Sequence, residues 1–383
     1  MNYKIYKYLD NLNIKYANGN IKEFSKLLRQ YYGKQKTENI INAINRIPFG
    51  DMDSLYALKN KEFERSMVIS GASEYNYFIS IGKWLEDNLN LFGKTILDVG
   101  CDNGIMSCFL ASLLPDSKII SIDQHETSIK IAMQLAEKLN LNNIKFQVSK
   151  LENIDFCEYD TVLEMCILHE NINIDARKTL FMNFDDQVKY WENQTEKMAI
   201  DTAKLVKNNG NLISINRTDK NAYFYAWLTN LAKLNLKTDF NSLKQIKIPE
   251  GDKINNFQII ISTKENTNIK DIEQIFIANS VDFLNKAECF KHEADIKLLI
   301  CAKDVIAGYK YYDKQNNIIM EYALYSSKVD PTAIYIVFKS LLDNMFVLRT
   351  YDISETQAGL KEIENMKILA LKQKYKIESI KHK

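Results

Sequence analysis

The sequence is poor in cysteine, and its few cysteines are scattered. Its 383 residues include six cysteines, and no two of them form a C-x-x-C pair. They are too sparse for a disulfide scaffold, so we expect reduced thiols in a cytoplasmic protein. His125, His292 and His382 show no metal-ligand spacing either, and we therefore expect no metal site.

An excess of charge of either sign is also missing. Fifty Lys and Arg residues face 49 Asp and Glu residues, which leaves a formal net charge of +1. A basic field over the whole protein, of the kind that attracts nucleic acid, is therefore excluded, although a local basic patch is not.

Long apolar runs are absent as well. No run approaches the ~18 residues of a membrane-spanning helix, and residues 1–10 contain no apolar core of signal-peptide length. We therefore expect no membrane partner and a cytoplasmic location. With 46% hydrophobic and 26% charged residues, the composition is that of an ordinary globular protein. The length predicts two or three domains.

Hydrophobic periodicity divides the chain into three parts. Residues 1–64 are predicted to form a helical cap. Residues 65–265 alternate between strands and helices, which predicts a parallel sheet with helices on both faces. The last two strands of that part, 243–248 and 257–262, have a connection too short for a parallel crossover, so we expect them to be antiparallel. Residues 266–383 are predicted to form a small α+β domain.

In this last part, four segments have the pattern of strands. They are residues 296–302, 318–325, 334–341 and 345–351. A final helix is expected to follow, with Ser354 as its N-cap.

The main candidate site lies where a predicted strand turns into a helix, at Asp98-Val-Gly-Cys-Asp-Asn-Gly104. Gly100 and Gly104 permit a tight turn and a close approach of the backbone to a ligand. The helix N-terminus offers free N–H groups and a positive dipole end to a carboxylate or phosphate. Asp123 ends the next strand, roughly 20 residues on, where an acidic residue can hold ribose hydroxyls.

Two nucleotide ligands compete for this loop. The dinucleotide fingerprint G-x-G-x-x-G, started at Gly100, meets Asp102 and Ile105 and so fails at two of its three glycines. Asp102 would also repel a pyrophosphate. A ligand with a cationic amine and sulfonium suits the loop better, because its carboxylate can face the helix N-terminus.

The loop resembles the first motif of the class I, S-adenosylmethionine-dependent methyltransferases, D-x-G-x-G-x-G. Asp98, Gly100 and Gly104 match it, and Asp102 stands where the middle glycine is usual. Asp123 matches the family's acidic residue after the second strand.

Two later segments, 159–170 and 205–213, resemble the family's fourth-strand motif and its turn into the fifth strand. The resemblance covers about residues 65–265. It implies an α/β fold with a seven-stranded Rossmann-like methyltransferase sheet and an antiparallel last strand. Ser149 stands where the family often has an Asp near the adenine.

The resemblance implies S-adenosyl-L-methionine as the cofactor. The residues expected to bind it are Asp98, Gly100, Cys101, Asp102, Gly104, Asp123, Gln124, Leu151 and Glu164. Two residues are candidates for catalysis. His169 follows the fourth strand, where a general base with a pKa near the working pH could act. Glu164 is a carboxylate in an otherwise apolar strand, where burial without a partner is costly.

The methyl acceptor is left open. The N-P-P-[YF] tetrapeptide of exocyclic-amine DNA methylation is missing, since residues 165–168 occupy its place, and the Pro-Cys pair of cytosine C5 enzymes is also missing. With the neutral charge, these absences favour a small-molecule or a peptide/protein acceptor. RNA, with the C-terminal domain as its binder, is an alternative. So is a cofactor-binding assembly module without turnover. Homo-oligomerisation through the flanking domains also stays open.

Overall fold

The computed structural model describes residues 3–14, 21–46, 52–154, 157–168, 178–182, 184–218, 221–239, 242–250, 253–265, 272, 287–290 and 292–380. The chain forms two compact units. The first unit comprises residues 1–173, 197–218 and 231–267, and the second comprises residues 174–196, 219–230 and 268–383. The domain boundaries expected after residues 64 and 265 stay predictions.

The N-terminal part of the first unit is helical, as its periodicity predicts. Its helices are α1 (Lys4–Asn11), α2 (Ile21–Arg46), α3 (Met52–Lys59) and α4 (Phe63–Asp87). Gly33 interrupts α2 with a φ of 72°, a left-handed conformation that favours glycine.

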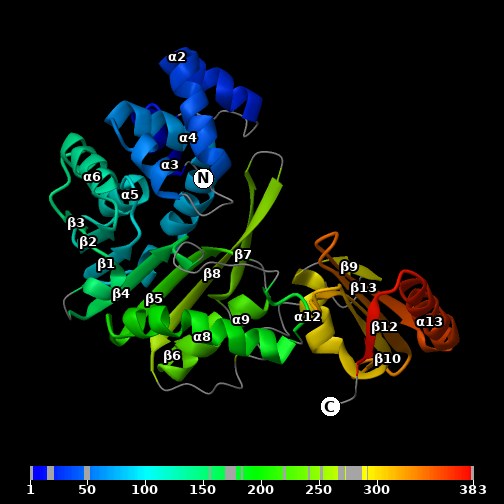
Figure 1. Ribbon diagram of the computed structural model, residues 1–383. Coiled ribbons are helices and arrows are strands. Elements are labelled where there is room, and N and C mark those ends of the chain that lie inside the picture. The colour runs from blue at the N-terminus through cyan, green and yellow to red at the C-terminus, as the bar shows by residue number, and fades with distance from the viewer. Residues whose placement is uncertain are drawn as a thin grey trace. The chain divides into compact units, whose positions relative to one another are not determined.

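A mostly parallel sheet forms the centre of the first unit (Figure 1). Its parallel strands are β1 (Thr95–Val99), β2 (Lys118–Asp123), β3 (Ile144–Val148), β4 (Tyr159–Met165) and β5 (Val206–Arg217). The order across the sheet is β3-β2-β1-β4-β5-β8-β6. The strand order reverses between β1 and β4, which is where open α/β sheets bind ligands. The predicted Rossmann-like sheet is confirmed.

The last strands of the sheet are antiparallel. They are β6 (Leu236–Thr238), β7 (Lys244–Glu250) and β8 (Lys253–Lys264). The pairing of β7 with β8 confirms the antiparallel pair expected from the short connection. Strand β6 was not expected from the sequence. It pairs with the C-terminal end of β8, whereas β7 pairs with the N-terminal half. The sheet therefore has one strand more than the seven predicted.

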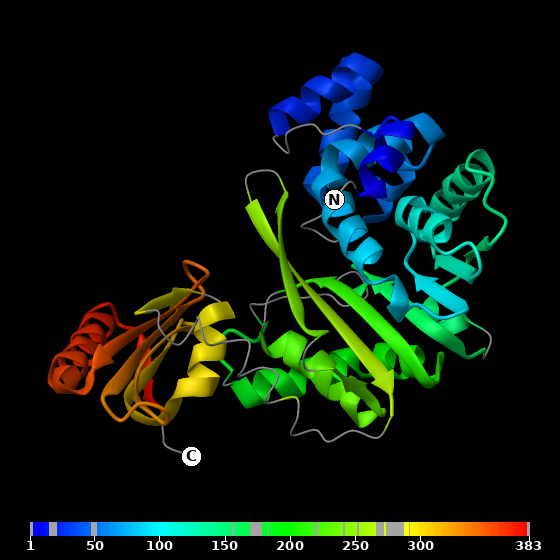
Figure 2. The ribbon, with the colours of Figure 1, turned by 180° about the vertical axis from the view of Figure 1, so that it is seen from behind.

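The hairpin of β7 and β8 extends beyond the sheet and lies beside α4 in both ribbon views (Figure 2). The side-chain amide of Asn76 on α4 donates to the carbonyl of Pro249 at 2.9 Å. The hairpin and the N-terminal helices are thus joined within the first unit.

A helix follows each of the strands β1, β2, β4 and β5 in the chain. These helices are α5 (Ile105–Leu113), α6 (Glu126–Lys138), α8 (Phe184–Ala203) and α9 (Ala222–Lys233). Helix α5 ends before Pro115, as expected for a residue that cannot continue a helix. The strands β1 and β4 are buried almost throughout, as in a parallel sheet covered on both faces.

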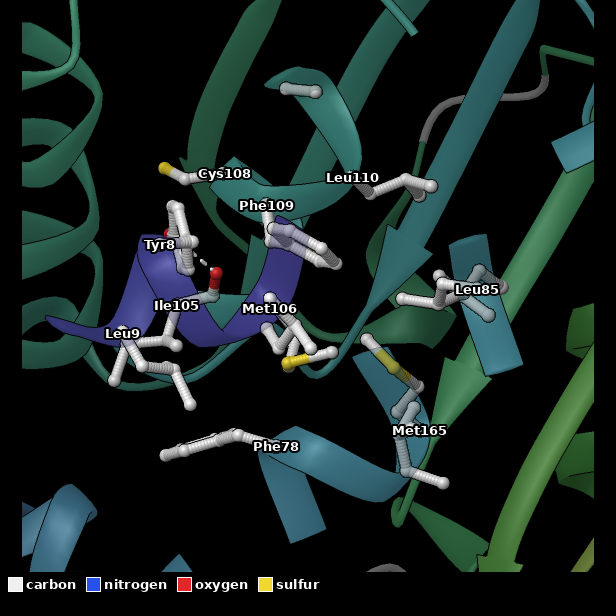
Figure 3. Close-up of a cluster of buried hydrophobic side chains, with 14 of the residues drawn as sticks. Tyr8, Leu9, Phe78, Leu85, Ile105, Met106, Cys108, Phe109, Leu110 and Met165 are labelled. Carbon is white, nitrogen blue, oxygen red and sulfur yellow. Dashed lines mark hydrogen bonds between the residues drawn. The ribbon is translucent and has the colours of Figure 1, made fainter. Parts of the chain in front are cut away.

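The main hydrophobic core joins α1 and α4 to α5 and the sheet (Figure 3). The ring of Tyr8 packs on Phe109 with 5.0 Å between centroids, and its hydroxyl donates to the carbonyl of Ile105 at 2.7 Å. Both ends of this contact are buried, so α1 holds the first turn of α5 as part of the same core.

The second unit contains an antiparallel sheet of order β14-β10-β11-β12-β13-β9. Its strands are β9 (Glu288–Phe290), β10 (Ala302–Tyr312), β11 (Ile318–Ser327), β12 (Ala333–Ser340), β13 (Met345–Asp352) and β14 (Lys376–Ser379); its helices include α12 (His292–Cys301) and α13 (Thr356–Lys372). The strands expected near 318–325, 334–341 and 345–351 are confirmed.

Two predictions for the second unit are wrong. Residues 296–301 belong to helix α12, because Glu293 and Asp295 in its first turn favour a helix start and a short apolar run does not distinguish the two structures. Ser354 is not the N-cap of the final helix. Asp352 caps the short turn before α13 by accepting the backbone N–H of Ser354, and Glu355 completes a capping box.

Among the residues that the structure describes, no helix is long and apolar enough to span a membrane. The same residues contain no cluster of three or more His, Cys, Asp and Glu side chains that could hold a metal ion.

Candidate cofactor site

The loop between β1 and α5 has three residues in the left-handed region. The φ values are 77° at Gly100, 44° at Asp102 and 76° at Gly104. A Cβ atom at Gly100 would lie 2.2 Å from Cγ2 of Ile167, and one at Gly104 would lie 2.7 Å from Cβ of Ala132. Both positions therefore require glycine, because a side chain there would clash with Ile167 or Ala132 at a φ that other residues rarely adopt.

Asp98 lies at the end of β1 and is fully buried. Its Oδ2 accepts the hydroxyl of Ser107 at 2.5 Å, whereas its Oδ1 accepts no hydrogen bond from the residues described. Burial raises the pKa of Asp98 to about 6, against the opposing effect of the hydroxyls of Ser107 and Ser121. A buried carboxylate oxygen without a partner is costly, so this atom indicates a place for a further donor.

Asp123 connects the loops that follow β1 and β2. Its Oδ2 accepts the backbone N–H of Asp102 at 2.9 Å, and its Oδ1 accepts that of His125 at 2.8 Å. Burial raises the pKa of Asp123, although the backbone N–H of His125 opposes the shift. Gln124 beside it is exposed, and Leu151 opens a short turn after β3.

Asp102, the residue in place of the usual glycine, has a cationic partner. Its Oδ2 lies 2.6 Å from Nζ of Lys59, which also lies 2.9 Å from Oε2 of Glu74 on α4. Burial by itself raises the pKa of Asp102, but the charge of Lys59 and the hydrogen bonds from Lys59, Asn60 and Ser128 together hold the pKa below its usual value. The negative charge that the sequence places in the loop is therefore neutralised within the protein.

Further polar side chains surround this ion pair. The amide of Asn60 donates to Asp102 Oδ1 at 2.8 Å and to Ser128 at 2.7 Å. The amide of Asn103 donates to Ser66 and Ser70 on α4 at 2.7 and 2.8 Å. Helices α3 and α4 are thus hydrogen-bonded directly to the cofactor loop.

The ring of Tyr56 on α3 stacks on His125, just after Asp123, with 4.7 Å between centroids. Tyr56, Lys59 and Asn60 were missed by the sequence prediction, because they lie in a part of the chain without a recognisable motif. The signal that could have found them is Asp102, since a carboxylate in a glycine position requires a partner.

Glu164 lies in β4 and is fully buried. Its Oε1 accepts the hydroxyl of Thr202, near the end of α8, at 2.5 Å, and its Oε2 accepts no hydrogen bond from the residues described. Burial raises the pKa of Glu164 to about 7, opposed by the Thr202 hydroxyl. The structure supplies the polar partner that the sequence required, whereas a role in the cofactor site stays a prediction.

His169, the other candidate for catalysis, lies outside the described residues. The strand before it, β4, ends at Met165, and Cys166 directly after the strand has a φ of 62°. Tyr77 on α4 hydrogen-bonds with Cys166 and lies against Phe257, with 5.4 Å between ring centroids. Helix α4 therefore also borders the carboxyl end of β4.

Cys101 is the remaining predicted residue of the loop. Its side chain is buried, and burial raises the pKa of its thiol well above the usual value. The structure brings Asp98, Cys101, Asp102 and Asp123 together at the carboxyl ends of β1 and β2.

Comparison with known proteins identifies the central part of the chain. A family described as "Methyltransferase domain" matches residues 92–269. The chain is 28% identical over 109 residues to the ribosomal RNA small subunit methyltransferase C of Buchnera aphidicola. The matched segment covers 28% of this chain and 32% of that protein. It is 29% identical over 122 residues to the protein-lysine N-methyltransferase EFM4 of Saccharomyces cerevisiae. This second match covers 29% of this chain and 53% of that protein. The chain therefore spans less than two thirds of the length of either relative.

Among solved structures, the chain is similar to magnesium protoporphyrin IX methyltransferase from Synechocystis. The TM-score is 0.38 and the identity 16%, over 63% of this chain and 97% of that protein. The family match, together with the strand order of the sheet and the glycine loop after β1, leads to one conclusion. Residues 92–269 match the methyltransferase-domain family, and the first unit has the Rossmann-like sheet of a class I, S-adenosylmethionine-dependent methyltransferase.

Proposed function

We propose that the chain is a methyltransferase that transfers the methyl group of S-adenosylmethionine to a small-molecule or peptide/protein acceptor. The observation that carries the proposal is the loop between β1 and α5, whose tight turn requires two glycines and which is hydrogen-bonded to Asp123.

The residues present fit this cofactor. A side chain at Gly100 or Gly104 would clash with Ile167 or Ala132, so the tight turn of the loop depends on both glycines. Asp98 has a buried oxygen that lacks a donor, which a cationic amine can supply. The N-terminus of α5 has no side-chain cap, so its N–H groups can receive a carboxylate. The residues that would hold the cofactor are Asp98, Gly100, Cys101, Asp102, Gly104, Asp123, Gln124 and Leu151.

When bound, the cofactor supplies an activated methyl group on a positively charged sulfur. The task left to the protein is alignment of the acceptor, and positioning can contribute most of the rate. A general base is needed only for an acceptor that arrives protonated. We propose His169 for that role, and Glu164 as a second, buried candidate. If the His169→Ala variant turns over at the wild-type rate, the assignment of His169 fails.

Two observations support the acceptor class. The neutral net charge does not favour a polyanion. EFM4, one of the relatives, acts on protein lysine according to its name.

RNA is the second candidate, because another relative is a ribosomal RNA methyltransferase. The two candidates are separated by incubating the purified protein with methyl-labelled cofactor and a cell extract divided into small-molecule, protein and RNA fractions. Label in the small-molecule or protein fraction supports the proposal, whereas label in RNA alone overturns the acceptor class. The Asp123→Ala variant serves as the control for label transferred by other enzymes in the extract.

A further inference from the structure

One face of α3 contacts both loops of the candidate cofactor site. Tyr56 and Lys59 are three residues apart, the spacing that places side chains on one side of a helix, and Asn60 follows directly after the last residue of α3. Lys59 and Asn60 contact Asp102 after β1, and Tyr56 stacks on His125 after β2. All three lie outside residues 92–269, to which the methyltransferase family is matched.

These contacts form a closed circuit, that is, a chain of contacts that starts at α3, passes through both loops and ends at α3 again. Nζ of Lys59 lies 2.6 Å from the Asp102 carboxylate, and the backbone N–H of Asp102 donates to Asp123 at 2.9 Å. Asp123 accepts the N–H of His125 at 2.8 Å, and the ring of His125 stacks on the ring of Tyr56 on α3. Because each contact restrains the next, a shift of α3 moves both loops.

Lys59 is the member of this circuit with the strongest need for its partners. Its side chain is only 5% exposed. Burial by itself lowers the pKa of Lys59, but Asp102 and Glu74 outweigh that effect and raise the pKa above its usual value. The charged amine is therefore retained, and its removal would leave the Asp102 carboxylate without a cation in a largely buried place.

The backbone conformation of Asp102 makes its ion pair with Lys59 important for the shape of the loop. A φ of 44° is uncommon for a residue other than glycine, and the carboxylate faces Lys59 while the N–H faces Asp123. Without Lys59, the Asp102 carboxylate would keep the donors of Asn60 and Ser128 on one oxygen but would lose the cation on the other. The residue, and with it the N–H that faces Asp123, would then be held less firmly.

We propose that Lys59 is a positioning residue for the cofactor, and that it acts by holding Asp102 so that the loop after β1 stays joined to Asp123. The cofactor site then includes α3, and the N-terminal helices are an integral part of it. This inference rests on the proposed function, because it concerns the same cofactor.

The test is a set of variants of the full chain titrated with S-adenosylmethionine by calorimetry, each with its melting temperature. Lys59→Met removes the charge and keeps the length of the side chain, and we expect the dissociation constant to rise at least tenfold. Lys61→Met is the matched control, since Lys61 is exposed two residues away, and its affinity should match that of the wild type.

The decisive variant combines Lys59→Met with Asp102→Gly. Asp102→Gly restores the residue that the family's motif usually has and removes the carboxylate that Lys59 neutralises. We expect the double variant to bind within threefold of the Asp102→Gly single variant, because Lys59 then has nothing left to position. A purely structural lysine would lose as much affinity in either background.

Each outcome decides the inference. Unchanged affinity of Lys59→Met overturns it, and so does a loss that Asp102→Gly fails to rescue. If Lys59→Met does not fold, Lys59→Gln is compared in the same two backgrounds with the same criteria. A wild-type protein that binds no cofactor contradicts the proposed function instead, so the two failures are distinguishable.

Discussion

The carboxylate of Asp123 lies 2.9 Å from the backbone nitrogen of Asp102, and this contact joins the ends of two neighbouring strands. The second oxygen of Asp123 accepts the N–H of His125. One acidic side chain therefore sets the distance between the loops that we propose for the cofactor.

The Asp123→Ala variant is expected to bind S-adenosylmethionine at least tenfold more weakly than the wild type. The substitution removes both loop contacts and the carboxylate proposed for the ribose. Calorimetry measures the change, with Asp116→Ala as the control, since Asp116 is an exposed aspartate outside the site. Equal affinity of Asp123→Ala and the wild type would count against our placement of the ribose.

The Gly100→Ala variant is expected to lose about 2–5 kcal/mol of unfolding free energy, from left-handed strain of about 1–2 kcal/mol and an overpacking cost of about 1–3 kcal/mol. The added Cβ would lie 2.2 Å from Ile167 at a φ of 77°. Urea denaturation measures the loss.

Gly33→Ala provides the matched control for that experiment. Gly33 has a φ of 72°, and a Cβ there would meet no atom within 4 Å. With a ψ of 174°, Gly33 lies in a region open almost only to glycine, so its variant should lose only a backbone strain of about 1–3 kcal/mol and keep its cofactor affinity. If the two variants lose the same free energy, the clash with Ile167 does not exist.

The stability of the protein should depend on the ionisation of Glu164. Burial raises the pKa of Glu164 from 4.5 to about 7, so the folded state binds more protons than the unfolded state between these two values. The stabilisation from this group is present below pH 4.5 and is lost as the pH rises to 7, by about 3 kcal/mol at most. Urea unfolding at pH 5 and pH 8 measures this loss. The Glu164→Gln variant should show a smaller loss between the two pH values, and an identical loss would refute the assignment.

Cofactor affinity should fall at low pH because Asp98 becomes protonated. Burial raises the pKa of Asp98 to about 6, so most of its negative charge is present at pH 7.5 and about a tenth of it at pH 5. Since the cofactor is cationic, we expect the affinity to fall roughly tenfold over this range. In the Asp98→Asn variant the loss of cofactor affinity between pH 7.5 and pH 5 should be smaller. The loss that remains would come from Asp123, whose pKa is also raised. The same pH dependence in both proteins would show that Asp98 does not face the cofactor.

The parts of the site that the sequence predicts are those built from neighbours in the chain. Asp98, Gly100 and Gly104 lie within one turn, and Asp123 ends the next strand, so their spacing already indicates a nucleoside site. The sheet order follows for the same reason, because strand and helix alternate regularly between residues 95 and 217.

The parts that were not predicted depend on contacts between distant segments or on weak local signals. Lys59 lies 43 positions before its partner Asp102 in a segment with no motif, and nothing local indicates that the two meet. Strand β6 has only three residues, which is too short for a periodic pattern. Asp352 rather than Ser354 caps the turn before α13. The two residues are two positions apart and both are common N-caps, so the sequence alone does not distinguish them.

The most direct test of the account is calorimetric titration of the wild-type protein with S-adenosylmethionine and with its demethylated product. We predict saturable binding of both ligands to one site per chain, weakened in the Asp123→Ala variant. No binding of either ligand at millimolar concentration would contradict the account.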